Sequence, residues 1–506
     1  MMLPTAPLRA QNNLPALGDA ATGDFGVVTE RRVGEQIMRE VRRDADYLDD
    51  PLLLEYVQSL WSPLVAQARA NGNITAEIET RFAWEAFLVR DRSVNAFALP
   101  GGYVGVHLGL IALTGSRDEL ASVLAHELSH ITQRHIARGI TNSKTQSLIG
   151  LAAMIIGVIA ASRSRSTDGV AAAVTSGQAA SIQGQLNFSR DMEREADRIG
   201  FQVLTGAGFA PGGMAAMFEK LDQSSRLNDS GGYPYLRSHP LTVERIGEAR
   251  ARLGTLPARP APGPNGASYE HALAQGRARV LMDTRVDALR RWQGLDFARA
   301  DLTAPQKLAD AYSSALASVL LRDADRADAS ILRAQAVLAD VARTEARAAR
   351  WVTMLKVQSQ LARGDVAGAT ASLKPLIADA SRPVMLMSAE LALAGATGAG
   401  GEAALKRSAE DLQTRVAAKS GDVLAWSLLS RTWAKLGQPL RSLRAEGEAQ
   451  YAMGDLRGAI DRLRAGQRLA QGGGATDFIE SSVIDSRLRD LQAQQRALAA
   501  EERESR

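Results

Sequence analysis

Two histidines and a glutamate near residue 130 have a spacing that suits metal chemistry. His126, Glu127 and His130 form the pattern His-Glu-x-x-His within a stretch that has the apolar periodicity of a helix. Residues four apart lie one above the other on a helix, so both imidazoles can bind one ion. Glu127 then lies one residue round, within reach of a water molecule at the metal. The pattern is typical of zinc sites that activate water, although five letters also recur by chance.

The residues around this motif predict the helix that must carry it. Ser116 to Glu119 has the Ser-x-x-Glu pattern of a capping box, which marks a helix N-terminus. An apolar stripe follows at helical spacing, made of Leu120, Val123, Leu124, Leu128 and Ile131. We therefore expect the motif on a helix that packs against the rest of its domain.

A second stretch, residues 187–200, offers the carboxylate that a two-histidine site lacks. A catalytic zinc ion takes three protein ligands, and the third must be His, Asp or Glu because the chain has no cysteine. If residues 191–204 are helical, Glu193 and Asp197 share one face, whereas Glu195 points about 200° away from Glu193. One of the two could bind metal while the other holds a ligating imidazole. A solvated helix of mixed charge is the simpler alternative.

Elements before the motif are predicted to line the site. Two amphipathic helices are expected, over residues 29–43 and 51–70. Residues 78–89 and 92–106 are β-prone and are interrupted by Pro100-Gly101-Gly102, which predicts a small sheet. Asn95 to Leu99 is the candidate edge strand, to which a peptide substrate could add its backbone.

The apolar run Leu148 to Ala161 is too short to span a membrane. Its fourteen residues cover about 21 Å as a helix, against a hydrocarbon layer of about 30 Å. We expect a buried helix or a lid, with peripheral contact of this segment with a membrane as the alternative. Residues 162–185, rich in Ser, Gly, Ala and Gln, suit a flexible flap.

The chain is globular and long enough for more than one domain. Its 506 residues are 45% hydrophobic and 23% charged. The net charge is +4 and the basic residues are spread along helices, so no nucleic-acid partner is expected. We expect a flexible N-terminal segment, a mainly helical α+β domain, a proline-rich linker and a helical repeat domain, over residues 1–25, 26–253, 254–267 and 268–500.

The last domain carries a repeated turn phrase. Residues 361–369 read LARGDVAGA and residues 451–459 read YAMGDLRGA. Gly437 and Gly454 lie 17 residues apart, half of the 34-residue tetratricopeptide unit. We therefore predict an all-α tetratricopeptide-like solenoid whose concave face binds a peptide or a partner protein. An inert helical tail would have a similar composition.

Taken together, the chain resembles the gluzincin peptidase family that includes the prenyl-protein (CAAX) proteases and the bacterial heat-shock membrane proteases. The resemblance rests on Asn12 to Pro15, Asn95 to Gly102, His126-Glu127-x-x-His130, Ser189-Arg190 and Glu193-x-x-Ala196-Asp197. It implies a zincin-type metalloprotease fold with one Zn²⁺ per chain. It also implies these roles: metal ligands His126, His130 and Glu193, general base Glu127, and Asp197 as the carboxylate that holds the ring of His126 without binding the metal.

Four further histidines need an interpretation. His239 lies in Tyr235-Leu-Arg-Ser-His-Pro240, and the resemblance places His239 and Arg245 at the rim of the active site, where we count both as catalytic. His239 could donate to the oxyanion of a tetrahedral intermediate, occupy the open zinc position and hold the enzyme latent, or only cap a loop. The remaining histidines are predicted to bind no metal, since they are out of helical phase or lack metal-spaced neighbours: His107, His135 and His271.

The resemblance implies an exported zinc metalloendopeptidase for outer-membrane protein quality control in the periplasm. Its substrates would be unfolded or stalled outer-membrane proteins, and its repeat domain would dock on the barrel-assembly machinery. No export signal is visible in residues 1–20, which contain three prolines, although Leu3 to Gln11 could be the remainder of one. The competing interpretation is a chaperone or assembly scaffold with a largely latent metal site.

Overall fold

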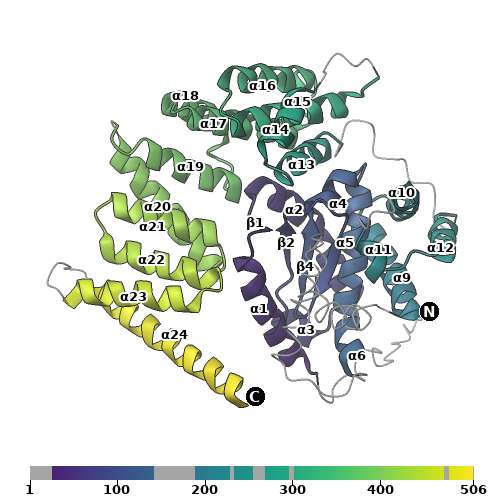
Figure 1. Cartoon of the computed structure of the whole chain (residues 1–506), viewed down its shortest axis with the longest axis horizontal. Coiled ribbons are helices and arrows are strands. Elements are labelled where there is room, and N and C mark those ends of the chain that lie inside the picture. The colour runs from purple at the N-terminus through teal and green to yellow at the C-terminus, as the bar shows by residue number, and fades with distance from the viewer. Residues whose placement is uncertain are drawn as a thin grey trace, which may run out of the picture.

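The structure combines a small sheet, helices on both of its faces and a long series of packed helices (Figure 1). This computed structural model describes residues 25–141, 189–227, 233–254, 268–295, 301–398, 400–471 and 478–504. The predictions for Leu148 to Ala161, for residues 162–185, for the N-terminal segment before residue 25 and for most of the linker lie outside the described residues. Within the described ranges no helix has the length and apolar character needed to cross a membrane.

The part of the chain before the linker contains all the strands that the structure describes. The strands are β1 (Tyr47–Leu48), β2 (Glu85–Val89), β3 (Ala96–Leu99) and β4 (Tyr103–His107). The helices are α1 (Val27–Arg43), α2 (Pro51–Ala70), α3 (Ala76–Arg81), α4 (Leu108–Leu113), α5 (Arg117–Thr132), α6 (His135–Thr141), α9 (Arg190–Gly206), α10 (Gly212–Leu227), α11 (Tyr235–Ser238) and α12 (Val243–Leu253).

The sheet is mixed and is buried between helices. Its order is β1-β2-β4-β3, with β2 and β4 parallel and the outer pairs antiparallel. Alternate residues of a strand point to opposite faces. Phe87 and Val89 of β2 accordingly pack in the cluster that includes α1, whereas Ala86 and Leu88 pack with α2 and α5. The sheet therefore supports α5 from one side.

The predicted elements of this part are largely confirmed. Both N-terminal helices are present, and β3 lies at the edge of the sheet as expected. The β-prone interpretation of residues 78–81 is wrong, because they belong to α3. The side chain of Thr75 accepts a hydrogen bond from the amide of Ile78 and so caps a short helix there. The predicted turn before β4 requires glycine, since Gly101 and Gly102 have φ of 78° and 88°.

The part of the chain after the linker is entirely helical in the described residues, in agreement with the predicted all-α region. Its helices are α13 (Ser268–Leu281), α14 (Val286–Gln293), α15 (Ala304–Leu320), α16 (Ala324–Leu338), α17 (Ala346–Ala362), α18 (Val366–Leu373), the 3₁₀ helix η2 (Lys374–Leu376), α19 (Arg382–Ala394), α20 (Gly401–Ala418), α21 (Val423–Lys435), α22 (Pro439–Ala452), α23 (Leu456–Gln471) and α24 (Phe478–Glu504). Figure 1 shows these helices curving round the N-terminal elements α1, β1 and α2.

The repeated phrase of this region forms the same turn twice, between α17 and α18 and between α22 and α23. In both copies the glycine, Gly364 or Gly454, has a positive φ of 80° or 90°. The next residue, Asp365 or Asp455, accepts a hydrogen bond from the amide three residues on, at 2.8 or 2.9 Å. The phrase thus ends one helix and starts its partner. A tetratricopeptide classification and the domain limits stay predictions.

A buried arginine and a partly buried one join the helical region to the acidic turn that precedes α2. Arg277 of α13 donates to both oxygens of Asp50 at 2.7 and 2.6 Å, and Arg382 of α19 donates to Asp49 at 2.7 and 2.6 Å. A single hydrophobic cluster also includes buried side chains from both parts of the chain, the first being Val27 and the last Leu391. The two parts of the chain therefore pack as one body through α2, α4, α13 and α19.

The pair between Arg277 and Asp50 gives a stability prediction. Both side chains are only 7% exposed, so Arg277→Leu leaves a buried carboxylate without its counter-charge. We expect the free energy of unfolding to fall by about 3–5 kcal/mol, measured by urea denaturation. The matched variant Arg291→Leu, which breaks a solvent-exposed pair with Asp287, should change little. Equal losses in the two variants would contradict this account.

Candidate metal centre

Helix α5 holds the His-Glu-x-x-His motif inside the core. It begins as predicted, because the hydroxyl of Ser116 accepts a hydrogen bond from the amide of Glu119 at 3.2 Å. The helix packs against β3, β4, α2, α9 and α10, so it is buried on nearly all sides. His126, Glu127 and His130 are each exposed by 1% or less. Polar side chains so deeply buried need partners, and α9 supplies two of them, Glu193 and Asp197.

Helix α9 lies directly on α5 at the level of the motif. Ser189 caps it by accepting a hydrogen bond from the amide of Met192 at 3.2 Å. At Gly200 the two backbones approach so closely that a Cβ atom would lie 3.1 Å from the carbonyl oxygen of Ala125. The helical phase then turns Glu193 and Asp197 toward α5, as the spacing predicted.

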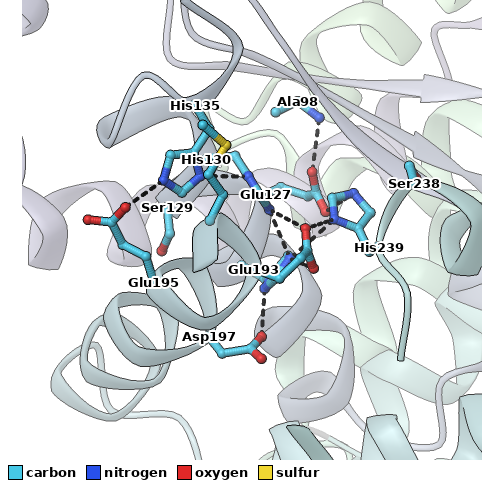
Figure 2. A network of polar contacts seen from close by, with 12 residues as sticks. Ala98, Glu127, Ser129, His130, His135, Glu193, Glu195, Asp197, Ser238 and His239 are labelled. Atoms are coloured by element: carbon cyan, nitrogen blue, oxygen red, sulfur yellow. Dashed lines mark hydrogen bonds and ion pairs between the residues drawn. The ribbon is translucent and has the colours of Figure 1, made fainter. Parts of the chain in front are cut away.

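Four side chains from three parts of the chain converge on one point (Figure 2). Nε2 of His126 lies 3.0 Å from Nε2 of His130, and each of these atoms lies 3.4 Å from an oxygen of Glu193. His239 follows α11, and its Nδ1 lies 2.9 Å from Glu193 and 3.4 Å from Nε2 of His126. All four ligand atoms lie within 4.8 Å of one another.

This donor set fits a tetrahedral metal ion. Zinc bonds of about 2.0–2.1 Å at tetrahedral angles place neighbouring donor atoms roughly 3.3 Å apart. The separations of 2.9 to 3.4 Å among His126, His130, Glu193 and His239 are close to that value. Imidazole nitrogen and carboxylate oxygen are also ligands that zinc accepts, and the chain contains no thiol to compete.

A layer of charged groups holds the ligands from behind. Asp197 lies 2.9 Å from Nδ1 of His126, which leaves Nε2 for the centre. The guanidinium of Arg245 donates to both oxygens of Asp197 at 2.7 and 2.8 Å and lies 2.8 Å from Glu193. Arg245 is only 4% exposed. The structure therefore places Arg245 against the two carboxylates rather than on an open rim.

Glu127 lies beside the four ligands and not among them. Its Oε2 accepts a hydrogen bond from the amide of Ala98 in β3 at 3.0 Å, and its Oε1 lies 3.4 Å from Nε2 of His239. Burial raises the pKa of Glu127, against the opposing effect of the nearby imidazoles of His239 and His126. A raised pKa suits a carboxylate that accepts a proton and later returns it.

The charges of the ligands are strongly coupled. Burial disfavours the charged form of His126, but the carboxylates of Glu193 and Asp197 outweigh it and raise the pKa of His126 to about 10. Burial alone would raise the pKa of Glu193, yet His239 and His126 hold it well below its usual range. Burial and the neighbouring His126 lower the pKa of His130 well below its ordinary value. The metal-free site thus holds a proton on one of its two motif histidines.

The sequence did not predict the contacts that His135 and Glu195 make beside the site. Nδ1 of His135 lies 2.9 Å from Nδ1 of His130, and Nε2 of His135 lies 2.9 Å from Glu195 (Figure 2). His135 does not belong to the ligand group, in agreement with its rejection as a ligand. Its contact with His130 was not foreseen because a single continuous helix was assumed, and neither glycine nor proline marks the break after Thr132.

The last two histidines lie away from the centre, as expected. His107 lies 2.9 Å from the hydroxyl of Ser93. His271 lies 2.6 Å from the hydroxyl of Tyr56 and 2.8 Å from the carbonyl oxygen of Thr114. Both are buried and hydrogen-bonded, which is sufficient to account for their positions.

Comparison with known protein families places this fold and this group of side chains in a peptidase family. The model of Peptidase family M48 matches residues 56–253, which include the whole ligand group. The chain belongs to this family, and the resemblance drawn from its motifs is confirmed.

Several named proteins are similar to the chain. The beta-barrel assembly-enhancing protease of Yersinia pestis is 31% identical over 487 residues, which cover 96% of this chain and 92% of that protein. The beta-barrel assembly-enhancing protease of Escherichia coli (strain K12) is 34% identical over 245 residues, so that match spans about half of each chain, 48%. A mitochondrial metalloendopeptidase of Saccharomyces cerevisiae is 26% identical over 217 residues, 42% of this chain and 59% of that protein.

The raised pKa of His126 predicts that metal binding releases protons. The folded, metal-free protein keeps His126 protonated up to about pH 10, and a metal ion must displace that proton from Nε2. We expect about one proton to be released at neutral pH, and the apparent affinity for Zn²⁺ to rise roughly tenfold for each pH unit. Calorimetry in buffers of different ionisation enthalpy measures the release. A pH-independent affinity would contradict the assignment.

Proposed function

We propose that this protein is a zinc metalloendopeptidase of the periplasm that degrades unfolded or stalled outer-membrane proteins. The observation that carries the proposal is the convergence of His126, His130, Glu193 and His239 beside the carboxylate of Glu127. The name of the Yersinia pestis relative, similar over nearly the whole chain, supports a role near barrel assembly.

In this proposal His126, His130 and Glu193 hold Zn²⁺. The ion would supply a Lewis acid that acidifies water and polarises the scissile carbonyl. Glu127 takes a proton from the attacking water and passes one to the leaving amine, and its burial keeps its pKa high enough for both steps. Asp197 and Arg245 act by fixing His126 and Glu193 in position.

The edge of the sheet next to Glu127 suits an extended peptide. β3 pairs with β4 on one side only, and the amide of Ala98 points away from β4 to reach Glu127. A substrate that adds its backbone along this edge would bring a peptide bond to the general base. Only an unfolded segment can pair in this way, which favours unfolded substrates over native proteins.

The arc of helices after the linker provides a surface for a partner. Stacked helix pairs with repeated turns form extended concave faces in solenoid proteins. We propose that this region acts as a tetratricopeptide-like solenoid that docks on the barrel-assembly machinery. Its rigid attachment through Arg277 and Arg382 would hold the peptidase site at a constant orientation to that partner.

A second candidate function, a chaperone or assembly scaffold with a latent site, is favoured by one observation. His239 completes the ligand group and also lies 3.4 Å from Glu127, on the space that an attacking water would need. We therefore propose that His239 takes the fourth zinc position at rest and that substrate or partner must displace it.

The Glu127→Gln variant separates peptidase from scaffold. It should bind Zn²⁺ like the native chain but cleave an unfolded outer-membrane protein at least about 100-fold more slowly, because it lacks the general base. The exposed substitution Glu77→Gln in α3 serves as the matched control. If native protein and Glu127→Gln degrade the substrate equally slowly while both bind the assembly machinery, the scaffold interpretation stands and the peptidase proposal fails.

The His239→Ala variant separates a latch from an oxyanion donor. If His239 occupies the fourth position at rest, its removal should raise the cleavage rate of an unfolded substrate several-fold, because three protein ligands are enough for a catalytic zinc. Ser238→Ala, one residue earlier in the same segment, controls for local disturbance. A fall of about 100-fold or more would instead identify His239 as a donor to the oxyanion.

A further inference from the structure

The second nitrogen of His130 faces another histidine instead of a carboxylate. Its Nε2 belongs to the ligand group, and its Nδ1 lies 2.9 Å from Nδ1 of His135. An imidazole that binds metal through Nε2 keeps its hydrogen on Nδ1. His130 therefore donates to His135, and His135 must accept through a deprotonated Nδ1.

The bond between His130 and His135 also decides which nitrogen of His135 carries the hydrogen. With Nδ1 of His135 accepting, its hydrogen lies on Nε2, which is 2.9 Å from Oε2 of Glu195. His130 and His135 are both fully buried, so water does not compete for the bond between them, whereas the side chain of Glu195 is 17% exposed. A single orientation of hydrogens, from His130 through His135 to Glu195, satisfies every nitrogen in the chain of contacts.

A break in the helix makes the contact with His135 possible. In a continuous helix a residue five positions on is turned by about 140° and its side chain would miss His130. α5 instead ends at Thr132, and Arg134 adopts a φ of 51°, which is uncommon for a residue with a side chain. The guanidinium of Arg134 is held by Glu30 at 2.9 Å and by the carbonyl oxygen of Phe25 at 2.7 Å. The turn that presents His135 is thus anchored from α1.

Glu195 is also fixed from a second side. Arg138 of α6 donates to its Oε2 at 2.9 Å. Glu195 lies on α9, two residues from Glu193, so the same helix carries one ligand and the supports of both motif histidines. Asp197 supports His126 directly, whereas Glu195 supports His130 through an inserted ring (Figure 2).

We propose that His135 and Glu195 form a relay that fixes the ring orientation and tautomer of His130 and so tightens metal binding. Both are positioning residues, since neither belongs to the ligand group. The inference rests on the proposed metal site. Groups that orient a ligating histidine in this way commonly change metal affinity about 10- to 100-fold.

The test measures the affinity of the full chain for Zn²⁺ by competition with a chromogenic chelator, with the visible spectrum of bound Co²⁺ as a second readout. Glu195→Ala should bind Zn²⁺ about 10- to 100-fold more weakly and alter the Co²⁺ spectrum. Glu195→Gln, whose amide oxygen can still accept from His135, should recover most of the affinity. Asp191→Ala on the exposed side of α9 is the matched control.

A double-mutant cycle tests whether Glu195 acts through His135. His135→Phe alone should weaken Zn²⁺ binding as Glu195→Ala does, and adding Glu195→Ala to it should cause no further loss. Additive losses, or unchanged affinity in Glu195→Ala, would overturn the relay. If the native chain itself bound no metal, the proposed function would fail instead, so the two failures are distinguishable.

Discussion

The close packing of α9 on α5 is the contact on which the rest of the site depends. Gly200 lets the backbone of α9 approach Ala125, and this approach brings Glu193 and Asp197 onto the histidines of α5. Two neighbouring carboxylates in the core would be costly without counter-charges. Arg245 contacts both of them, and His126 lies within 3.4 Å of both. The same groups that prepare the site for a cation therefore also stabilise the packing of the two helices.

The helical region is connected to this centre through one helix. α2 packs against α5 and β2 on one side, and against α13 and α19 on the other. Its N-terminus carries the acidic turn in which Asp49 and Asp50 are bound by Arg382 and Arg277. Bidentate ion pairs set direction as well as distance. A partner bound to the helical region would thus be held at a defined orientation to the candidate metal centre.

Helical spacing predicted two pairs of side chains, each on one helix face, whereas the choice of Glu193 over Asp197 as a ligand came from the family resemblance. His126 and His130 follow from an i, i+4 pair, and Glu193 with Asp197 from the same period on a second helix. What spacing cannot show is a change of direction inside an apparent helix. The break at Arg134 depends on an ion pair with Glu30, which is far away in sequence. The sheet could be predicted because β-prone residues and a Pro-Gly-Gly turn lie close together in the sequence. Residues 78–81 are the exception, since Thr75 caps the helix α3 where a strand was expected.

The element that carries each residue of the group indicates which side chain could be displaced from the site. His126 and His130 lie on a sixteen-residue helix in the core, and Glu193 lies on a helix packed against it through Gly200. His239 follows α11, which has only four residues and no side-chain cap. Moving it requires no change in α5 or α9, whereas moving any of the other three would separate the packed helices. Arg245, six residues after His239, lies on α12 and donates to both oxygens of Asp197. In the proposed resting state, the fold would thus permit His239 to be exchanged while His126, His130, Glu193 and their supports remain in place.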